Sequence, residues 1–309
     1  MKTDPDYSFA QLGNAVVEQL FPVDPPLKQI SVFTLRLDKI HAVVSGNKFF
    51  KLKYYLADAL DKDCKTILTF GGAWSNHIIA TAWLTREMGF RSIGMIRGEQ
   101  PASPSETLRQ AASYGMELHF LPRKSFAAGD YNNIIKSMPH NPGELYVIPQ
   151  GGAGDYGVKG SMEILSLAGG RRYSHVLCSM GTGTMFTGLI NSAEPDQEVI
   201  GIPAIRGITG IENIPQSPLT HPSKRNLCKI IPDYHFGGYA KKTPELIQFM
   251  NTFYARTGIP TDFVYTGKLF FACMDLLNKN YFPPGSSLLV VHSGGLQGNM
   301  SLKPETLEF

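Results

Sequence analysis

The chain of 309 residues has few cysteines and no long apolar run. Its four cysteines, Cys64, Cys178, Cys228 and Cys273, stand far apart, without the close pairs of a metal site or the density of a disulfide framework. No apolar stretch approaches the length of a membrane span, and the first residues lack the apolar core of a signal peptide. We therefore expect a cytoplasmic protein with free thiols and no membrane partner.

Charge and catalytic motifs are also sparse. The net charge is only +3, and no basic run exceeds Lys241-Lys242, so we expect a small-molecule ligand and no nucleic-acid partner. The sequence has no HxxxH or HExxH pair, and hence no expected metal site. It has neither a Gly-x-Ser-x-Gly elbow nor a clear pair of catalytic carboxylates, which argues against a hydrolase.

What is present is a regular alternation of short β-rich and helical segments, which predicts an α/β fold with parallel strands. The length and the 43% hydrophobic content suggest two lobes. The predicted strands are Ile30–Leu37, Thr66–Phe70, Arg91–Ile96, Glu117–Leu121, Glu144–Ile148, His175–Ser179, Glu198–Pro203 and Ser287–His292. The predicted helices are Phe49–Leu60, Asn76–Met88, Ser105–Tyr114, Asp130–Ser137, Tyr156–Ala168, Met185–Ser192, Pro244–Arg256 and Lys268–Leu277. Residues 205–238 give no clear periodicity.

The segment Ser45-Gly46-Asn47-Lys48 lies between the first predicted strand and its helix. A helix N-terminus favours a neutral amine and a nearby anion, so Lys48 is a candidate imine-forming nucleophile and Lys51 a candidate cation for that anion. The alternative is that Lys48, Lys51 and Lys53 form the solvated face of an amphipathic helix.

Gly181-Thr182-Gly183-Thr184 follows a predicted strand and opens a helix, where backbone N–H groups and hydroxyls can bind phosphate. It is not a Walker loop, because Leu189 stands where lysine is required. It also differs from the dinucleotide pattern, whose third glycine would fall at Phe186. The alternative is a tight turn that needs glycine for its backbone.

Three further loops also combine glycine with polar residues: Gly71-Gly72-Ala73-Trp74-Ser75-Asn76-His77, Tyr265-Thr266-Gly267-Lys268 and His292-Ser293-Gly294-Gly295. The first and last follow predicted strands, where open α/β sheets bind ligands. The alternative for Ser75 and Asn76 is a helix cap, and the other two loops are compatible with ordinary turns.

Together, in this order, these five motifs resemble the 1-aminocyclopropane-1-carboxylate (ACC) deaminase and D-cysteine desulfhydrase family, over residues 36–295. That resemblance implies pyridoxal 5'-phosphate as cofactor, a small amino-acid substrate and a homodimer. It also implies the two-lobed, three-layer α/β fold with open sheets of the tryptophan synthase β subunit, known as fold type II. A large cofactor-binding domain would comprise residues 1–51 and 149–309, and a small α/β domain residues 52–148.

The resemblance assigns roles to individual residues. Lys48 would hold the cofactor covalently, Lys51 and the loop of Gly181, Thr182, Gly183 and Thr184 would hold its phosphate, and Asn76 would bind the ring 3-oxygen. Ser75 would lie near the substrate, and Tyr239 and Tyr265 would be the two active-site tyrosines.

Two positions bear on the reaction. ACC deaminases carry Glu and Leu where this chain has Thr266 and Ser293, and a neutral group near the pyridine nitrogen suits β-elimination better than ring opening. We therefore expect a lyase that prefers D-cysteine. The alternatives are an ACC deaminase, a D-serine dehydratase-like enzyme and a non-catalytic protein that binds the cofactor or another phosphate. The sequence departs from the family pattern at Phe49-Phe50 and at Arg36-Leu37-Asp38. These departures leave the substrate specificity undecided.

Overall fold

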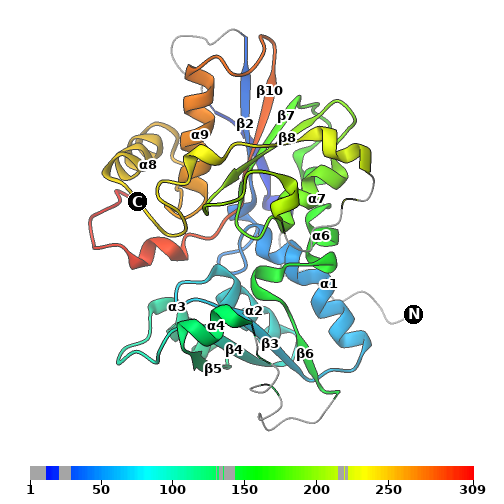
Figure 1. The fold of residues 1–309 in the computed structure, drawn as a ribbon, viewed down its shortest axis with the longest axis vertical. Helices are drawn as coiled ribbons and strands as arrows, with labels where there is room; N and C mark the ends of the chain where they lie inside the picture. The colour runs from blue at the N-terminus through cyan, green and yellow to red at the C-terminus, as the bar shows by residue number, and fades with distance from the viewer. Residues whose placement is uncertain are drawn as a thin grey trace.

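The computed structural model describes residues 12–20, 29–129, 131, 135, 143–214, 219 and 222–309. Figure 1 shows two lobes, each built around its own sheet, with the long helix α1 (Asn47–Asp61) running between them. Both sheets are covered by helices, as parallel sheets with buried strands require.

The large lobe contains a six-stranded sheet in the order β1-β2-β10-β7-β8-β9. All neighbouring pairs are parallel except β1 and β2. The strands are β1 (Val16–Gln19), β2 (Ser31–Arg36), β7 (His175–Met180), β8 (Glu198–Pro203), β9 (Cys228–Ile230) and β10 (Ser287–His292). Side chains alternate between its faces: Val176 and Cys178 pack in one hydrophobic cluster with α1 and α7, whereas Leu177 packs in another with α9.

The small lobe contains a parallel four-stranded sheet in the order β5-β4-β3-β6. Its elements are β3 (Thr66–Gly71), α2 (Asn76–Glu87), β4 (Arg91–Arg97), α3 (Glu106–Ser113), β5 (Met116–Leu121), α4 (Arg123–Ala128) and β6 (Leu145–Val147). Apolar residues of α2 and α3 pack together on one face of the sheet, and Phe126 of α4 packs with Phe70 of β3 on another.

The remaining helices belong to the large lobe: α6 (Asp155–Ser161), α7 (Thr184–Ser192), α8 (Pro244–Thr257) and α9 (Thr266–Asn278). Short 3-10 turns cover Leu12–Asn14, Leu37–Lys39, Gln150–Gly152, Ile164–Ala168, Ile211–Asn213, Pro222–Leu227, Pro232–Tyr234 and Gln297–Ser301. Helix α6 packs closely on α1 at Gly160. The two backbones are so near that an added Cβ on this glycine would lie 1.8 Å from the carbonyl oxygen of Phe50. That contact holds the helix that carries Lys48 against the large lobe.

The α/β prediction and its parallel strands are confirmed, with element ends shifted by a few residues. The segment predicted as helix Tyr156–Ala168 is divided into α6 and a 3-10 turn. Strands β1 and β9 and helix α4 had no clear periodicity because they are short and partly exposed. The predicted helix Asp130–Ser137 lies almost wholly outside the described residues.

The expected domain limits at residues 51 and 148 stay a prediction, and the first of them falls within the continuous helix α1. All four cysteines are free. Within the described ranges, no helix is both long and apolar enough to cross a membrane.

Candidate functional site

A cavity of about 840 Å³ lies where the C-terminal ends of strands from both sheets meet. Ligands of open α/β sheets bind at such strand ends. The residues that line the cavity include Ser45, Asn47, Lys48 and Lys51; Gly72 and Trp74–His77 after β3; Gln150 and Gly151; Ser179 near the end of β7 and Gly181–Gly183 after it; Ile205–Ile208 after β8; Tyr239; Asp262 and Tyr265; and Ser293–Gly295 after β10. Four of the five motifs therefore reach the cavity through several residues, and the fifth reaches it through Tyr265.

Lys48 lies in the first turn of α1, and its position depends on Gly46. That glycine has φ +70°, and an added Cβ would lie only 1.7 Å from the carbonyl oxygen of Ser293. The Asn47 N–H donates to the same carbonyl at 3.0 Å, which joins the start of α1 to the loop after β10. The Lys48 ammonium donates to Asn47 Oδ1 at 3.2 Å.

Burial lowers the pKa of Lys48 to about 8, although the negative charge of Asp262 opposes the shift. A lower pKa means that more of the side chain is a neutral amine at a given pH. Neutral lysine is the form that attacks a carbonyl group, so this environment prepares Lys48 as a nucleophile. The solvated-face alternative does not describe α1, because Lys51 is buried and Lys48 and Lys53 are only partly exposed.

Lys51 is only 4% exposed, and no hydrogen bond or ion pair joins it to another described residue. Burial, followed by the charge of Lys48, holds its pKa well below the usual value. A buried cation without a partner is costly, and an anion in the cavity would remove that cost. Lys51 therefore marks a binding position for an anion.

The loop after β7 has the geometry of an anion cradle at the N-terminus of α7. Gly183 has φ +80°, and an added Cβ would lie 2.3 Å from Cγ2 of Ile214. Gly181 is less tightly constrained, since its added Cβ would lie 3.1 Å from the Tyr265 ring. The hydroxyls of Thr182 and Thr184 are 2.8 Å apart; Thr182 lines the cavity, whereas Thr184 is buried behind it. Backbone N–H groups in such a loop bind phosphate.

The loop before α2 serves two purposes. Ser75 Oγ accepts a hydrogen bond from the Ile78 N–H at 3.3 Å, so Ser75 caps the N-terminus of α2. The same residue also lines the cavity. Asn76 Nδ2 donates to the carbonyl oxygen of Gly295 at 3.2 Å, which joins the two lobes. Asn76 Oδ1 is buried and has no partner among the described residues, so this amide has capacity left for a ligand.

Tyr239 and Tyr265 come from separate segments and meet at the cavity. Their ring centroids are 6.1 Å apart in an edge-on arrangement. Tyr239 is half exposed, whereas burial, followed by the interaction with Tyr239, raises the pKa of Tyr265 well above its usual value. Tyr265 therefore keeps its proton at neutral pH.

Thr266 and Ser293 are placed differently. Ser293 lines the cavity, with its Oγ 3.4 Å from Ser179 Oγ. Thr266 is fully buried and is not among the lining residues; its hydroxyl donates to Asp262 Oδ1 at 2.8 Å. The position of Thr266 beside the pyridine nitrogen stays a prediction.

Asp262 was not recognised from the sequence as a site residue. The residue is fully buried at the cavity wall, and its carboxylate accepts hydrogen bonds from the N–H groups of Val264, Tyr265 and Thr266 and from the Thr266 hydroxyl. Burial raises the pKa of Asp262, and the hydrogen bonds led by those from Thr266 oppose that rise. An aspartate just before a helix is a capping signal that could have identified it.

Arg97 and Arg206 also line the cavity, from the end of β4 and the loop after β8. Gln150 joins them from a 3-10 turn. None of these stands in a recognisable motif, so only the fold brings them to the cavity.

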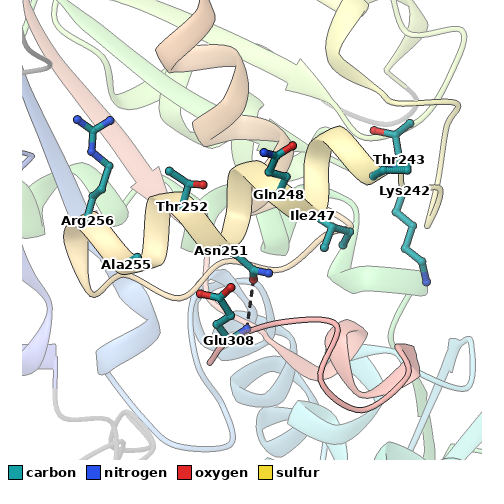
Figure 2. Close-up of a pocket in the computed structure, with 10 residues that line it drawn as sticks. Lys242, Thr243, Ile247, Gln248, Asn251, Thr252, Ala255, Arg256 and Glu308 are labelled. Carbon is teal, nitrogen blue, oxygen red and sulfur yellow. Dashed lines mark hydrogen bonds between the residues drawn. The ribbon is translucent and has the colours of Figure 1, made fainter.

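A second cavity of about 820 Å³ lies along α8. Figure 2 shows its lining side chains spread along α8, with Lys242 and Thr243 before the start of the helix and Glu308 beside Asn251. Asn251 Oδ1 accepts the Glu308 N–H at 3.2 Å. No residue predicted for the site lines this groove, which leaves the strand-end cavity as the candidate site.

The family described as "Pyridoxal-phosphate dependent enzyme" matches residues 19–294. The chain belongs to this family. A protein of Pyrococcus horikoshii that is named as a candidate ACC deaminase is 28% identical over 94% of this chain and 95% of its own. The crystal structure of an ACC deaminase homologue matches with a TM-score of 0.76 and 25% identity, over 92% of this chain and 90% of that one.

An O-acetylserine-dependent cystathionine β-synthase from Helicobacter pylori has the same fold. It matches with a TM-score of 0.67 at 16% identity, over 96% of this chain and 97% of that one. The predicted fold type, family and cofactor are thereby confirmed: the chain is a pyridoxal-phosphate-dependent enzyme of fold type II.

Proposed function

We propose that this enzyme is a β-eliminating lyase for a small amino acid, with D-cysteine as its preferred substrate. The observation that carries the proposal is Lys48, a cavity lysine whose pKa is lowered to about 8. It lines the cavity together with Lys51, a cation without a partner among the described residues, and with a glycine-rich anion cradle. The residues present fit pyridoxal phosphate, because its phosphate would supply the anion that the buried Lys51 needs, and the Asn76 amide still has hydrogen-bonding capacity for the ring.

In this proposal Lys48 would link the cofactor to the protein, Lys51 and the loop of residues 181–184 would hold its phosphate, and Asn76 would bind the ring 3-oxygen. When bound, the cofactor supplies an electron sink for the bond that breaks at the substrate α-carbon.

The side chains of the cavity then handle protons. Lys48 removes the proton from the α-carbon, and Tyr265, which keeps its proton at neutral pH, donates to the departing sulfur. Ser75 and Tyr239 line the substrate side. With one water molecule, D-cysteine yields pyruvate, ammonia and hydrogen sulfide.

The rival substrate is ACC, which the name of the Pyrococcus horikoshii relative favours. Two features support β-elimination instead. Ser293 lines the cavity where ACC deaminases carry leucine. Asp262 is the one carboxylate among the described residues that line the cavity, and it already accepts four hydrogen bonds, so it is not free to accept one from a protonated pyridine nitrogen.

The test compares D-cysteine, D-serine and ACC as substrates of the purified, cofactor-loaded enzyme. Pyruvate with sulfide identifies D-cysteine elimination, pyruvate alone identifies D-serine, and 2-oxobutyrate identifies ACC ring opening. We expect the largest kcat/KM with D-cysteine. Faster turnover of ACC would overturn the proposed substrate, and a lysine-linked cofactor band with no turnover of any of the three would favour the non-catalytic alternative.

A further inference from the structure

Lys268 is a buried lysine outside the cavity whose role the proposed reaction does not explain. Its side chain is 1% exposed and lies in the first turn of α9. The ammonium donates to the carbonyl oxygens of Gly238 at 2.8 Å, His235 at 2.9 Å and Ala204 at 3.4 Å. Three backbone carbonyls from two separate segments therefore meet at one cation.

This placement has an electrostatic cost. The N-terminal turn of a helix disfavours a positive charge, and burial disfavours any charge. Burial lowers the pKa of Lys268 to about 8, with the charge of Asp262 opposing the shift, and none of the described carboxylates forms an ion pair with it. An apolar side chain would fill the same space without that cost. What lysine adds over an apolar residue at this position is the three hydrogen bonds to backbone carbonyls.

The two segments that Lys268 joins both lead into the cavity. Ala204 directly follows β8 and lies two residues before Arg206. Gly238 directly precedes Tyr239, and His235 lies four residues before it. Arg206 and Tyr239 both line the cavity, so the ammonium connects two parts of its wall from behind.

The segment around Tyr239 also has a strained backbone. Phe236 and Ala240 have φ values of +49° and +52°, which non-glycine residues rarely adopt, and Gly238 has φ +116°. The Phe236 ring packs edge-on against Phe271 of α9, with centroids 4.8 Å apart. Strained residues persist when their surroundings hold them in place, and here α9 holds this segment through both Phe271 and Lys268.

We propose that Lys268 is a positioning residue for Tyr239: its hydrogen bonds to Ala204, His235 and Gly238 fix the segment of residues 235–240 against the cavity, and thereby set the affinity for substrate. The structural part stands on the geometry alone, whereas the effect on affinity rests on the proposed function.

Limited digestion with trypsin tests the structural part without any substrate. Lys241 and Lys242 follow the segment directly and are exposed, so release of the segment should speed cleavage there. We expect Lys268→Met to raise the rate of cleavage at these lysines about tenfold or more. The matched control is Lys279→Met, which removes an exposed lysine from the C-terminal end of the same helix and should leave the rate unchanged. Equal rates in the wild type and Lys268→Met would overturn the proposal.

Kinetics with D-cysteine test the positioning of Tyr239. We expect Lys268→Met to raise KM about tenfold with a smaller change in kcat, and to have almost no further effect in a Tyr239→Ala background. Effects that multiply in the double variant would show that Lys268 does not act through Tyr239. If Lys268→Met fails to fold, Lys268→Gln, which keeps a donor, should show the same pattern more weakly in both experiments. If the wild type does not turn over D-cysteine, the proposed function fails and the trypsin result alone decides the role of Lys268.

Discussion

Lys51 in α1 and Lys268 in α9 are both buried lysines with lowered pKa values, yet their surroundings differ. Lys268 donates to three backbone carbonyl oxygens, so the protein itself satisfies its ammonium. Lys51 lines the cavity and has no such partner among the described residues. Because a buried charge without a partner costs stability, its presence at the cavity points to a ligand that supplies the missing charge.

The contrast separates two uses of the same side chain. A lysine that the fold satisfies serves the architecture, and its removal should reduce stability. A lysine whose ammonium has no hydrogen-bond partner in the fold serves binding. Its removal should reduce the affinity for the anion and raise the stability of the ligand-free protein. Lys48 shares the cavity with Lys51 and has a pKa lowered by burial, but it donates one hydrogen bond, to Asn47 Oδ1.

The largest effect is expected for Lys48→Ala, which removes the nucleophile. The absorbance band of the lysine-linked cofactor should disappear, and turnover should fall by about a thousandfold or more. Lys53→Ala is the control, because Lys53 lies on the same helix but forms an ion pair with Glu163 at 2.8 Å. An unchanged band in Lys48→Ala would refute the assignment of this residue.

Lys51→Met should weaken pyridoxal phosphate binding by about 10- to 100-fold, because charge-assisted hydrogen bonds to phosphate are among the strong ones. Binding of pyridoxal, which lacks the phosphate, should change little. Measuring both affinities separates loss of a phosphate contact from general damage to the cavity. An equal loss for both ligands would place Lys51 away from the phosphate.

The rate of cofactor loading should depend on pH through Lys48. Because burial lowers its pKa to about 8, the neutral amine increases as pH rises towards 8 and is nearly complete above 9. We expect loading of the cofactor-free protein to speed up about tenfold between pH 7 and 9 and then level off. Free N-acetyl-lysine, with an ordinary pKa, should keep rising past pH 10 under the same conditions. A protein profile that follows the free amine would contradict the lowered pKa.

The parts of this site that consist of residues adjacent in the chain could be predicted from the sequence. Glycine loops after strands, and Lys48 at a helix start, are visible as motifs because their chemistry depends on adjacent residues. The difference between Lys51 and Lys268 was not visible, since it depends on whether distant backbone carbonyls, those of Ala204 and Gly238, approach the side chain. The same holds for Thr266, whose hydroxyl direction is set by the turn that Asp262 holds.

The smallest effects, of opposite sign, are expected for the stability of the cofactor-free protein. Lys51→Met should raise the free energy of unfolding by about 1 kcal/mol, because an apolar side chain replaces a buried charge that has no partner among the described residues. Lys268→Met should lower it by about 2 kcal/mol, because three carbonyl oxygens lose a charged donor, although those of His235 and Gly238 each keep a backbone N–H donor. Urea unfolding of both variants measures the two changes. If both variants are stabilised, the carbonyl contacts of Lys268 contribute less than its burial costs, and the distinction between a satisfied and an unsatisfied lysine does not hold for this fold.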